Sequence, residues 1–404
     1  MEKIHKVISE NIISVKEAKQ LVEENITRLS PLTVPLRDAH GLVLASDVIA
    51  PIDLPGWSQS SMDGYAFRFA NWKPGQLLRI AGEVPAGSKA TVPLATGSAM
   101  RIFTGAPLPE GADTVVMQEK TSVNEGLLNI LDASLQPGSN VRPQGSEINR
   151  GQTALEAGQK ITPAGIGFLA GLGINKVDVY PLPHVCIIVT GNELQKPGEP
   201  LQAGKIYDSN SWSLQAALNQ AGIKHAEIIY AEDKLETLSA AINESLENAD
   251  VVLLTGGVSV GDYDFVSTAA EQNGIERIFH RVKQRPGKPL FFGKKKNKFL
   301  FGLPGNPASA LSCFYVYVEP ALKQMAGQKS SLRTLQVPLE GSFRKSTALS
   351  HFLKGYYDGS HAKLLQGQES FRLSSFAKAN CLIRIGESTN ECRPGDSVEI
   401  ILFR

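Results

Sequence analysis

Apolar runs and segments of helical character alternate between residue 184 and about residue 325. The short apolar runs predict buried strands at Val185–Val189, Ala226–Tyr230, Val251–Leu254, Ile275–Val282 and Phe299–Gly302. The predicted helices are Ser209–Ala221, Lys234–Glu247, a segment that follows Asp264, and Ala308–Met325. This alternation predicts a central parallel α/β domain of the doubly wound type, with helices on both faces of its sheet.

Short alternating segments rich in glycine and proline flank this region. Residues 51–142 predict a small antiparallel β domain, and the residues after 327 predict a C-terminal β module. Upstream, the capping-box pattern of Ser14 and Glu17 predicts the start of a helix. We therefore expect a multidomain α/β plus β protein. Its expected domains are 1–50 with 143–180, an inserted β domain at 51–142, the α/β domain at 181–327, and a C-terminal β-barrel-like module at 328–404.

Composition and charge describe a globular chain with no general attraction to nucleic acid or membranes. Of its 404 residues, 41 are basic and 40 are acidic, so the charges nearly cancel. The chain has no long apolar run that predicts a transmembrane helix, and its charged N-terminus lacks a signal-peptide core. Its four cysteines are widely spaced. We expect a reduced, cytoplasmic protein without a cysteine metal site.

Three of the predicted strands end in loops that combine glycine with polar residues. These loops are Thr190–Glu193, Thr255–Gly261 and Pro304–Pro307. Because the carboxyl ends of parallel strands meet at one edge of a sheet, we expect the loops to form a single crevice for one ligand. Glycines let backbone N–H groups approach an anion, and Asp262 and Asp264 can hold a hard cation. The alternative for the second loop is a tight turn with solvated aspartates.

A basic segment lies close to the third loop. It contains Arg281, Lys283, Arg285 and Lys288, and Pro286-Gly287 predicts a turn that gathers these cations. Such a cluster suits an oxyanion or a phosphate, and the alternative is a solvated surface turn. The chain has neither a Walker A motif nor a dinucleotide fingerprint, so P-loop NTPases and Rossmann dehydrogenases are poor matches.

The first half of the chain offers three further polar candidates, Asp63, Thr104 and Glu147. Asp63 precedes a glycine, and an isolated aspartate in that position is usually a turn residue. From the residues alone, a structural role for Asp63 is the simpler interpretation.

Seven segments together resemble the signature blocks of the molybdopterin molybdenumtransferase family, which includes the E domain of gephyrin. They read SMDGYAF, RIFTGAPLPEGADTVVMQE, NVRPQGSEINRG, TGNEL, GGVSVGDYDF, RPGKP and GLPGNPAS. The resemblance implies a Mg²⁺-assisted enzyme that inserts molybdate into adenylylated molybdopterin, forming molybdenum cofactor and releasing AMP. It also implies a homodimer whose active site lies across the subunit interface, and a possible association with the upstream molybdopterin adenylyltransferase.

The resemblance also assigns roles to particular residues. It implies catalytic roles for Asp63, Thr104, Glu193, Asp233 and Asp264, with Asp264, Glu193 and Asp262 as metal ligands. The implied substrate-binding residues are Gly256, Gly257, Ser259, Arg281, Arg285, Lys288, Pro304, Gly305, Asn306 and Pro307.

The chain departs from the family pattern in places. Glu147 stands where the family often has Asp. The family often has Arg-x-x-Phe-x-Arg in the C-terminal module, and the corresponding segment here is Leu349-Ser-His-Phe352-Leu-Lys354. One cation is lost, and Lys354 cannot form the guanidinium fork. Two alternative functions are a non-catalytic scaffold or pterin-binding protein of the same fold, as in gephyrin, and a nucleotide-dependent transferase that ignores molybdate.

Overall fold

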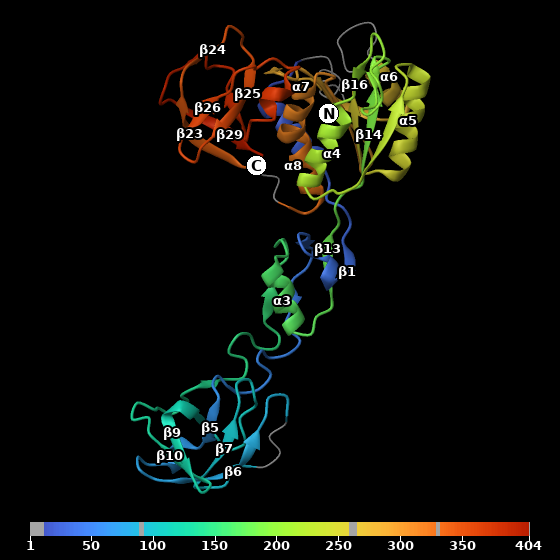
Figure 1. The fold of residues 1–404 in the computed structure, drawn as a ribbon. Coiled ribbons are helices and arrows are strands. Elements are labelled where there is room, and N and C mark those ends of the chain that lie inside the picture. Colours follow the sequence, from blue (N-terminus) through green and yellow to red (C-terminus); the bar gives the residue numbers. More distant parts are fainter. Residues whose placement is uncertain (1–11, 89–92, 258–264, 329–331, 404) are drawn as a thin grey trace. The chain divides into compact units, whose positions relative to one another are not determined.

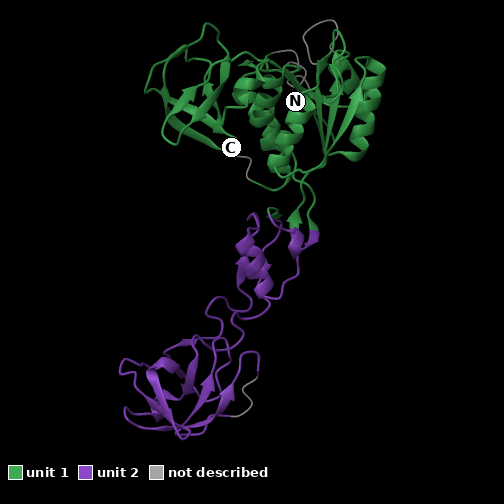
Figure 2. Ribbon diagram, in the orientation of Figure 1, with its two compact units in different colours: residues 1–32, 41–43, 179–404 green, residues 33–40, 44–178 purple. Residues whose placement is uncertain are grey.

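The computed structural model describes residues 12–88, 93–257, 265–328 and 332–403. The chain forms two compact units (Figure 2). One comprises Met1–Leu32, Gly41–Val43 and Val179–Arg404, and the other comprises Thr33–His40 and Leu44–Asp178. The four-part division expected from the sequence, with limits at residues 50, 142, 180 and 327, stays a prediction. No helix among the described residues is long and apolar enough to cross a membrane.

The larger unit is built on a six-stranded sheet with the order β17-β14-β18-β22-β21-β19 (Figure 1). Its strands are β14 (Val185–Thr190), β17 (Ala226–Ala231), β18 (Val251–Thr255), β19 (Glu276–Arg281), β21 (Pro289–Lys295) and β22 (Lys298–Leu303). β17, β14, β18 and β22 are parallel, which confirms the predicted parallel core. β21 is antiparallel, because a tight hairpin at Lys295 and Lys298 joins it to β22. β19 is antiparallel to β21 and so runs with the parallel strands.

Helices cover both faces of this sheet. Alternate strand residues such as Ile187 and Leu253 belong to a core that includes the N-terminal helix and the helices after residues 209 and 306, whereas Ile188 and Leu254 pack with the other two helices. The helices are α2 (Val15–Asn25), α4 (Asn210–Gln220), α5 (Leu235–Asn248), α6 (Phe265–Gln272), α7 (Pro307–Cys313), the π-helical turn η4 (Phe314–Val318) and α8 (Glu319–Met325). The doubly wound prediction is therefore confirmed, and the capping box of Ser14 and Glu17 is present at the start of α2.

The C-terminal module is a six-stranded sheet in which five strands close into a barrel and β20 is added alongside β25. Its order is β20-β25-β26-β23-β29-β27, with β25 also paired to β27. The strands are β20 (Gln284–Arg285), β23 (Thr334–Glu340), β25 (Ser350–Tyr357), β26 (Ala362–Leu364), β27 (Cys381–Ile385) and β29 (Ser397–Leu402), accompanied by the pair β24 (Phe343–Arg344) and β28 (Glu391–Cys392) and by the helix α9 (Leu373–Phe376). β20 comes from the basic segment, so this segment is hydrogen-bonded into the C-terminal module.

The smaller unit contains the predicted β domain, with the sheet order β8-β5-β7-β6-β10-β9. These strands are β5 (Gly64–Phe67), β6 (Leu78–Val84), β7 (Ser98–Ile102), β8 (Thr114–Met117), β9 (Thr121–Asn124) and β10 (Leu127–Ile130). The expectation of a purely antiparallel domain is wrong for β6 and β7, which pair in parallel. The connection between them, residues 85–97, is long enough to return the chain to the same end of the sheet.

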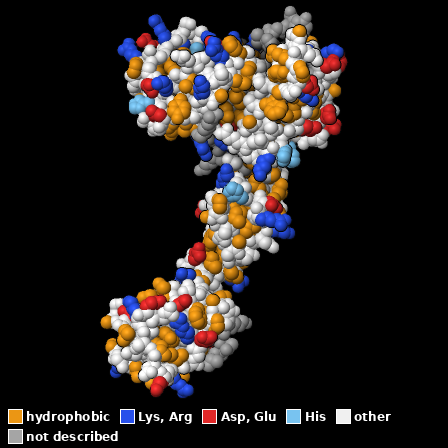
Figure 3. Space-filling model, in the orientation of Figure 1, with side chains coloured by type: hydrophobic (Ala, Val, Ile, Leu, Met, Phe, Trp, Pro, Cys, Tyr) orange, Lys and Arg blue, Asp and Glu red, His pale blue; other side chains and the backbone are white. Residues whose placement is uncertain are grey.

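Shorter elements complete the fold. They are β1 (Leu32–Pro35), η1 (Leu36–Asp38), β2 (Val43–Leu44), β3 (Val48–Ile49), β4 (Gln59–Ser60), η2 (Phe69–Asn71), η3 (Gln118–Lys120), β11 (Val141–Arg142), β12 (Thr153–Leu155), α3 (Pro163–Gly171), β13 (Lys176–Tyr180), β15 (Leu194–Gln195) and β16 (Ile206–Tyr207). Basic and acidic side chains are interspersed on the face of each unit shown in Figure 3, as the small net charge predicts.

Candidate functional site

The three predicted loops meet at the carboxyl edge of the α/β sheet. β14, β18 and β22 are neighbours in parallel register, with Val189 opposite Thr255 and Thr255 opposite Leu303. Residues from all three loops line one crevice of about 590 Å³. Among them are Thr190, Gly191, Glu193, Thr255, Gly256, Gly257, Pro304, Gly305, Asn306 and Pro307, and Asp233 lines the same crevice. Ser259, Asp262 and Asp264 lie outside the described residues.

Gly256 explains why the second loop needs glycine where β18 ends. Its backbone has a φ of +93°, in the left-handed region, and a Cβ atom there would lie 2.2 Å from the carbonyl oxygen of Thr190. A side chain would therefore meet immovable backbone of the neighbouring strand. The glycine allows two strand ends to approach each other and form the floor of the crevice.

Four buried side-chain atoms around the crevice have no hydrogen-bond partner among the described residues. They are Oγ1 of Thr190, Oδ1 of Asn210, Oδ1 of Asp233 and Oγ1 of Thr255. Buried polar groups are normally paired, because an unpaired one loses its hydration without compensation. A ligand with donors and acceptors would supply these partners, so the crevice has the features of a binding site rather than of a filled turn.

The first turn of α4 contributes residues that the sequence interpretation missed. Asn210 lines the crevice, and its Nδ2 donates to the carbonyl oxygen of Gly305 at 2.9 Å. The buried carboxylate of Asp208 accepts hydrogen bonds from Ser211 and, at 3.2 Å, from the hydroxyl of Tyr230. The polar triplet Asp208-Ser-Asn210 directly before an apolar helix was the available signal.

Three carboxylates of the described residues line this crevice, those of Glu193, Asp208 and Asp233. Ser211 and Tyr230 already engage Asp208, so Glu193 and Asp233 are the two that suit a divalent cation. Glu193 is exposed and Asp233 is half-buried, and both line the cavity. No cluster of three or more metal-binding side chains occurs within the described ranges. Mg²⁺ commonly uses one or two protein carboxylates together with water and phosphate oxygens, so this pair fits a cation held jointly with a phosphate-bearing ligand.

The basic turn lines a second cavity of about 370 Å³ that is adjacent to the crevice and shares part of its wall. Arg285, Gly287 and Lys288 line the second cavity, and Pro289, Pro304, Asn306 and Phe371 line both. Arg281 lines neither cavity; its carbonyl oxygen accepts a hydrogen bond from the backbone of Ile13. Of the three cationic residues predicted to bind substrate, Arg285 and Lys288 therefore lie beside the crevice and Arg281 does not.

Buried amide and hydroxyl groups hold the basic turn in place. Nε2 of Gln284 donates to the carbonyl oxygen of Gly287 at 2.8 Å, and the buried hydroxyl of Tyr317 donates to Oε1 of Gln284. Behind the turn, burial together with the cations of Lys345 and Arg285 lowers the pKa of His351 to about 4. His351 is therefore neutral at physiological pH and adds no charge to the cationic turn.

Lys354, a departure from the family pattern, is an internal residue. Its side chain is buried, and its ammonium donates to the carbonyl oxygens of Gly367, Glu369 and Arg372 at 2.6, 3.0 and 3.2 Å. Burial lowers the pKa of Lys354. Its cation thus organises the neighbouring loop, whereas Leu349 lines the second cavity.

Asp63 and Thr104 form a separate pair in the smaller unit. Oδ1 of Asp63 accepts hydrogen bonds from the backbone N–H and from the hydroxyl of Thr104, both at 2.7 Å. These two bonds, with a smaller contribution from Arg101, lower the pKa of Asp63. Arg101, which the sequence interpretation missed, lies 5.2 Å from the ring of Tyr65 and donates to the carbonyl oxygen of Gly64. Glu147 is exposed.

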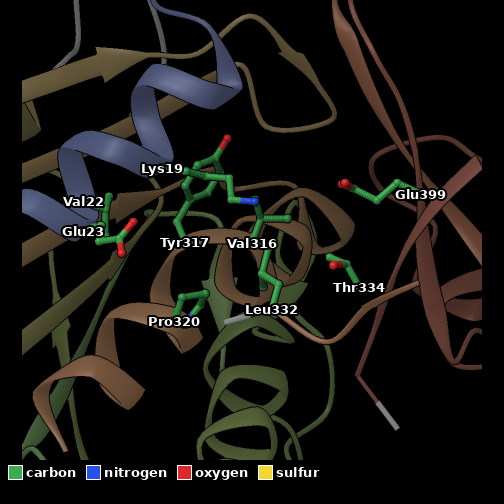
Figure 4. A pocket seen from close by; sticks show the side chains of 9 residues that line it. All are labelled: Lys19, Val22, Glu23, Val316, Tyr317, Pro320, Leu332, Thr334 and Glu399. Carbon is green, nitrogen blue, oxygen red and sulfur yellow. The ribbon is translucent and has the colours of Figure 1, made fainter. Parts of the chain in front are cut away.

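A third cavity, of about 310 Å³, lies between α2, η4 and the C-terminal module. Figure 4 shows Lys19 and Glu23 reaching into it from α2, with Thr334 and Glu399 on the opposite side. Burial lowers the pKa of Lys19, while Glu399 opposes that shift. None of the predicted site residues lines this cavity, so the crevice remains the candidate site.

Three family models match the chain in succession. The model described as "MoeA N-terminal region (domain I and II)" matches residues 13–173, "Probable molybdopterin binding domain" matches residues 186–324, and "MoeA C-terminal region (domain IV)" matches residues 336–403. The basic turn and the crevice residues from Thr190 to Pro307 lie within the second match, Phe371 lies within the third, and Asp63 and Thr104 lie within the first.

Full-length relatives agree with these matches. The molybdopterin molybdenumtransferase of Haemophilus influenzae is 33% identical over 91% of this chain and 93% of its own length. Molybdopterin molybdenumtransferase 2 of Mycobacterium tuberculosis is 34% identical over 96% of this chain and 98% of its own. A crystal structure of the molybdopterin biosynthesis moea protein from Pyrococcus horikosii has a TM-score of 0.84 at 30% identity, covering 98% of this chain and 100% of that one. The chain therefore belongs to the molybdopterin molybdenumtransferase family, whose members are transferases of molybdenum cofactor biosynthesis.

Proposed function

We propose that this protein inserts molybdate into adenylylated molybdopterin, forming molybdenum cofactor and releasing AMP. The observation that carries the proposal is that two cavities with complementary chemistry are adjacent and share lining residues. One has four unpartnered buried polar atoms at the end of a parallel sheet, and the other presents Arg285 and Lys288. A large polar substrate occupies the first while an oxyanion is held beside it in the second.

The residues of the crevice suit cleavage of a phosphate–phosphate linkage. The unpartnered atoms of Thr190, Thr255 and Asn210 orient the substrate, and the cationic side chains neutralise negative charge on its phosphate oxygens. Molybdate is a tetrahedral dianion, and the guanidinium of Arg285 and the ammonium of Lys288 are the charges it requires.

Glu193 and Asp233 would hold a divalent cation such as Mg²⁺, and Asp262 and Asp264 are proposed as further ligands on the basis of the family resemblance. When bound, the cation neutralises charge on the departing phosphate. The unpartnered Oδ1 of Asp233 supports its role as a ligand. The preference for Mg²⁺ over other divalent cations is tested by titrating the metal into the metal-free protein and measuring binding by calorimetry.

We also propose a homodimer in which Asp63 and Thr104 of the partner subunit complete the crevice. The lowered pKa of Asp63 supports a role as a permanently ionised carboxylate. Complementation between inactive variants tests this arrangement. Mixtures of the Asp63→Asn and Asp233→Asn proteins, after subunit exchange, regain activity if each site uses residues of both subunits. Mixtures that stay inactive although exchange is complete contradict it.

The insertion reaction is tested by supplying adenylylated molybdopterin with and without molybdate and measuring AMP release and cofactor formation. We expect molybdate to stimulate both. A rate of AMP release that does not depend on molybdate would indicate a nucleotide-dependent transferase of another kind. Absence of any turnover by the folded protein would favour a binding or scaffold role. Copurification with the molybdopterin adenylyltransferase tests the proposed association with that enzyme.

A further inference from the structure

The loop of residues 366–372, which we call the rim loop, carries an exposed aromatic side chain at the edge of the crevice. Phe371 is 62% exposed, the largest exposed fraction among the large hydrophobic side chains of the described residues. It lines both the crevice and the second cavity. Large aromatic side chains are usually covered, so a ring this exposed on the rim of a cavity is available to a ligand.

The rim loop is held firmly, so the exposure of Phe371 is built into the fold. Lys354 donates to three of its carbonyl oxygens, those of residues 367, 369 and 372. On the other side, the backbone N–H of Ala308 in α7 donates to the carbonyl oxygen of Ser370 at 3.0 Å. The amide of Gln368 exchanges hydrogen bonds with the backbone of Lys354 at 2.9 and 2.8 Å. The loop is thus fixed to both the C-terminal module and the α/β domain.

The side chain of Arg372 lies beside the ring of Phe371. The guanidinium carbon of Arg372 lies 5.9 Å from the ring centroid, and Arg372 is itself paired with Glu369 at 3.0 Å. The hydrogen-bonded backbone of the rim loop limits where this ring can lie, which lowers the entropic cost of presenting its apolar face to a ligand. Stacking of a base on an aromatic side chain typically contributes about 1–3 kcal/mol.

We propose that Phe371 is a stacking platform for a planar heteroaromatic ring of the substrate, and that Lys354 is the positioning residue that presents it. The proposal deepens the proposed function and rests on it, because the substrate named there carries two such rings, adenine and pterin. They share the chemistry that Phe371 recognises, a flat π-system with polar edges. The unpartnered polar atoms of the crevice are suited to those edges.

The first test measures ligand binding by the full-length protein with three probes: AMP, pterin and ribose 5-phosphate. We expect Phe371→Leu, which keeps an apolar side chain but removes the π-face, to weaken binding of AMP or of pterin about tenfold. Ribose 5-phosphate has no aromatic ring and should bind Phe371→Leu as it binds the wild type. The probe that loses affinity identifies the stacked ring.

Matched variants separate stacking from general surface effects. Phe371→Trp should retain or strengthen binding, and its added tryptophan fluorescence should be quenched by the stacked probe. Tyr356→Leu removes an aromatic side chain of similar exposure (47%) in the same module, outside both cavities, and should leave all three affinities unchanged. Unchanged binding of both AMP and pterin by Phe371→Leu overturns the proposal. So does a change of oligomeric state without a change of affinity, which would make Phe371 a protein contact.

Lys354 is tested through its effect on Phe371. We expect Lys354→Met to raise the KM for adenylylated molybdopterin more than it lowers kcat, and Lys354→Arg to restore part of the loss. In the Phe371→Leu background, Lys354→Met should add little, because the platform is already absent. If Lys354→Met raises the KM as much in the Phe371→Leu background as in the wild type, Lys354 has a purely structural role. If Lys354→Met does not fold, Lys354→Arg in both backgrounds gives the same comparison.

These results are distinguishable from failure of the proposed function. If molybdate does not stimulate AMP release by the wild type, the insertion function fails, whatever Phe371 does. If molybdate-dependent release is normal and Phe371→Leu binds both rings like the wild type, only the stacking proposal fails.

Discussion

The two acidic centres of this protein, the crevice of the α/β sheet and the Asp63–Thr104 pair of the smaller unit, differ in how their polar atoms are satisfied. Oδ1 of Asp233 is buried and has no hydrogen-bond partner within the described part of the chain. Oδ1 of Asp63 receives two hydrogen bonds from Thr104. The crevice is therefore unsatisfied until a ligand arrives, whereas Asp63 is oriented and ionised in advance. If the proposed roles hold, substitutions at the two centres should therefore differ in their effects on binding, catalysis and pH dependence.

The first and largest expected effect concerns Asp233. Asp233→Asn keeps the shape of the side chain but removes its charge, so it should lower kcat on the order of 10²-fold with little change in melting temperature. Steady-state AMP release and thermal unfolding measure both quantities. The control is Glu232→Gln, an exposed neighbour paired only with Lys234 at the surface. Wild-type activity in Asp233→Asn would show that the charge of this crevice carboxylate is not needed for catalysis.

The Asp63 centre should respond through its pH profile. Thr104→Val removes one donor, so the pKa of Asp63 rises and the acidic limb of kcat/KM moves to higher pH. Activity at neutral pH should fall less than in Asp63→Asn, because the backbone donor remains. Thr121→Val, at an exposed hydroxyl that bonds only its own turn, is the matched control. An unshifted acidic limb would show that the ionisation of Asp63 does not limit the rate.

Gly256→Ala tests the floor of the crevice. The added methyl group would lie 2.2 Å from the carbonyl oxygen of Thr190, on a backbone in the left-handed region. We therefore expect the substitution to lower the free energy of unfolding by about 3 kcal/mol, measured by urea denaturation. Gly305→Ala is the control, since a Cβ there meets only one atom, at 3.9 Å, and no positive φ is required. If the two variants have similar free energies of unfolding, the ends of β14 and β18 can move apart to accommodate the added methyl group.

The smallest effect concerns His351 behind the basic turn. Its pKa of about 4 in the folded protein lies below the unfolded value of about 6.5, so the unfolded chain binds the proton first. The contribution of neutral His351 to the free energy of unfolding is complete above pH 6.5 and is lost as the pH falls toward 4. In His351→Gln, the fall in apparent melting temperature between pH 7 and pH 4.5 should be smaller by roughly 2 °C. An equal fall in both proteins would contradict the burial of a neutral imidazole.

Much of the fold and part of the site follow from local sequence patterns. The strands from Val185 to Leu303 are nearly continuous apolar runs, because parallel strands are buried on both faces. Once these strands are parallel, their loops must share one edge, and the crevice follows. The pairing of β6 with β7 could not be predicted in the same way, because it depends on where the connection of residues 85–97 returns the chain.

The sequence by itself determined the order of domains, the parallel sheet, its glycine loops and the family, because these depend on short-range periodicity and on contiguous motifs. Only the tertiary structure decided that Asn210 joins the third loop, that Lys354 lies inside the protein and that Phe371 stands at the rim. The physical reason is that each depends on partners distant in the chain. Lysine is usually exposed and phenylalanine usually buried, so residue type alone predicts the reverse of both observations.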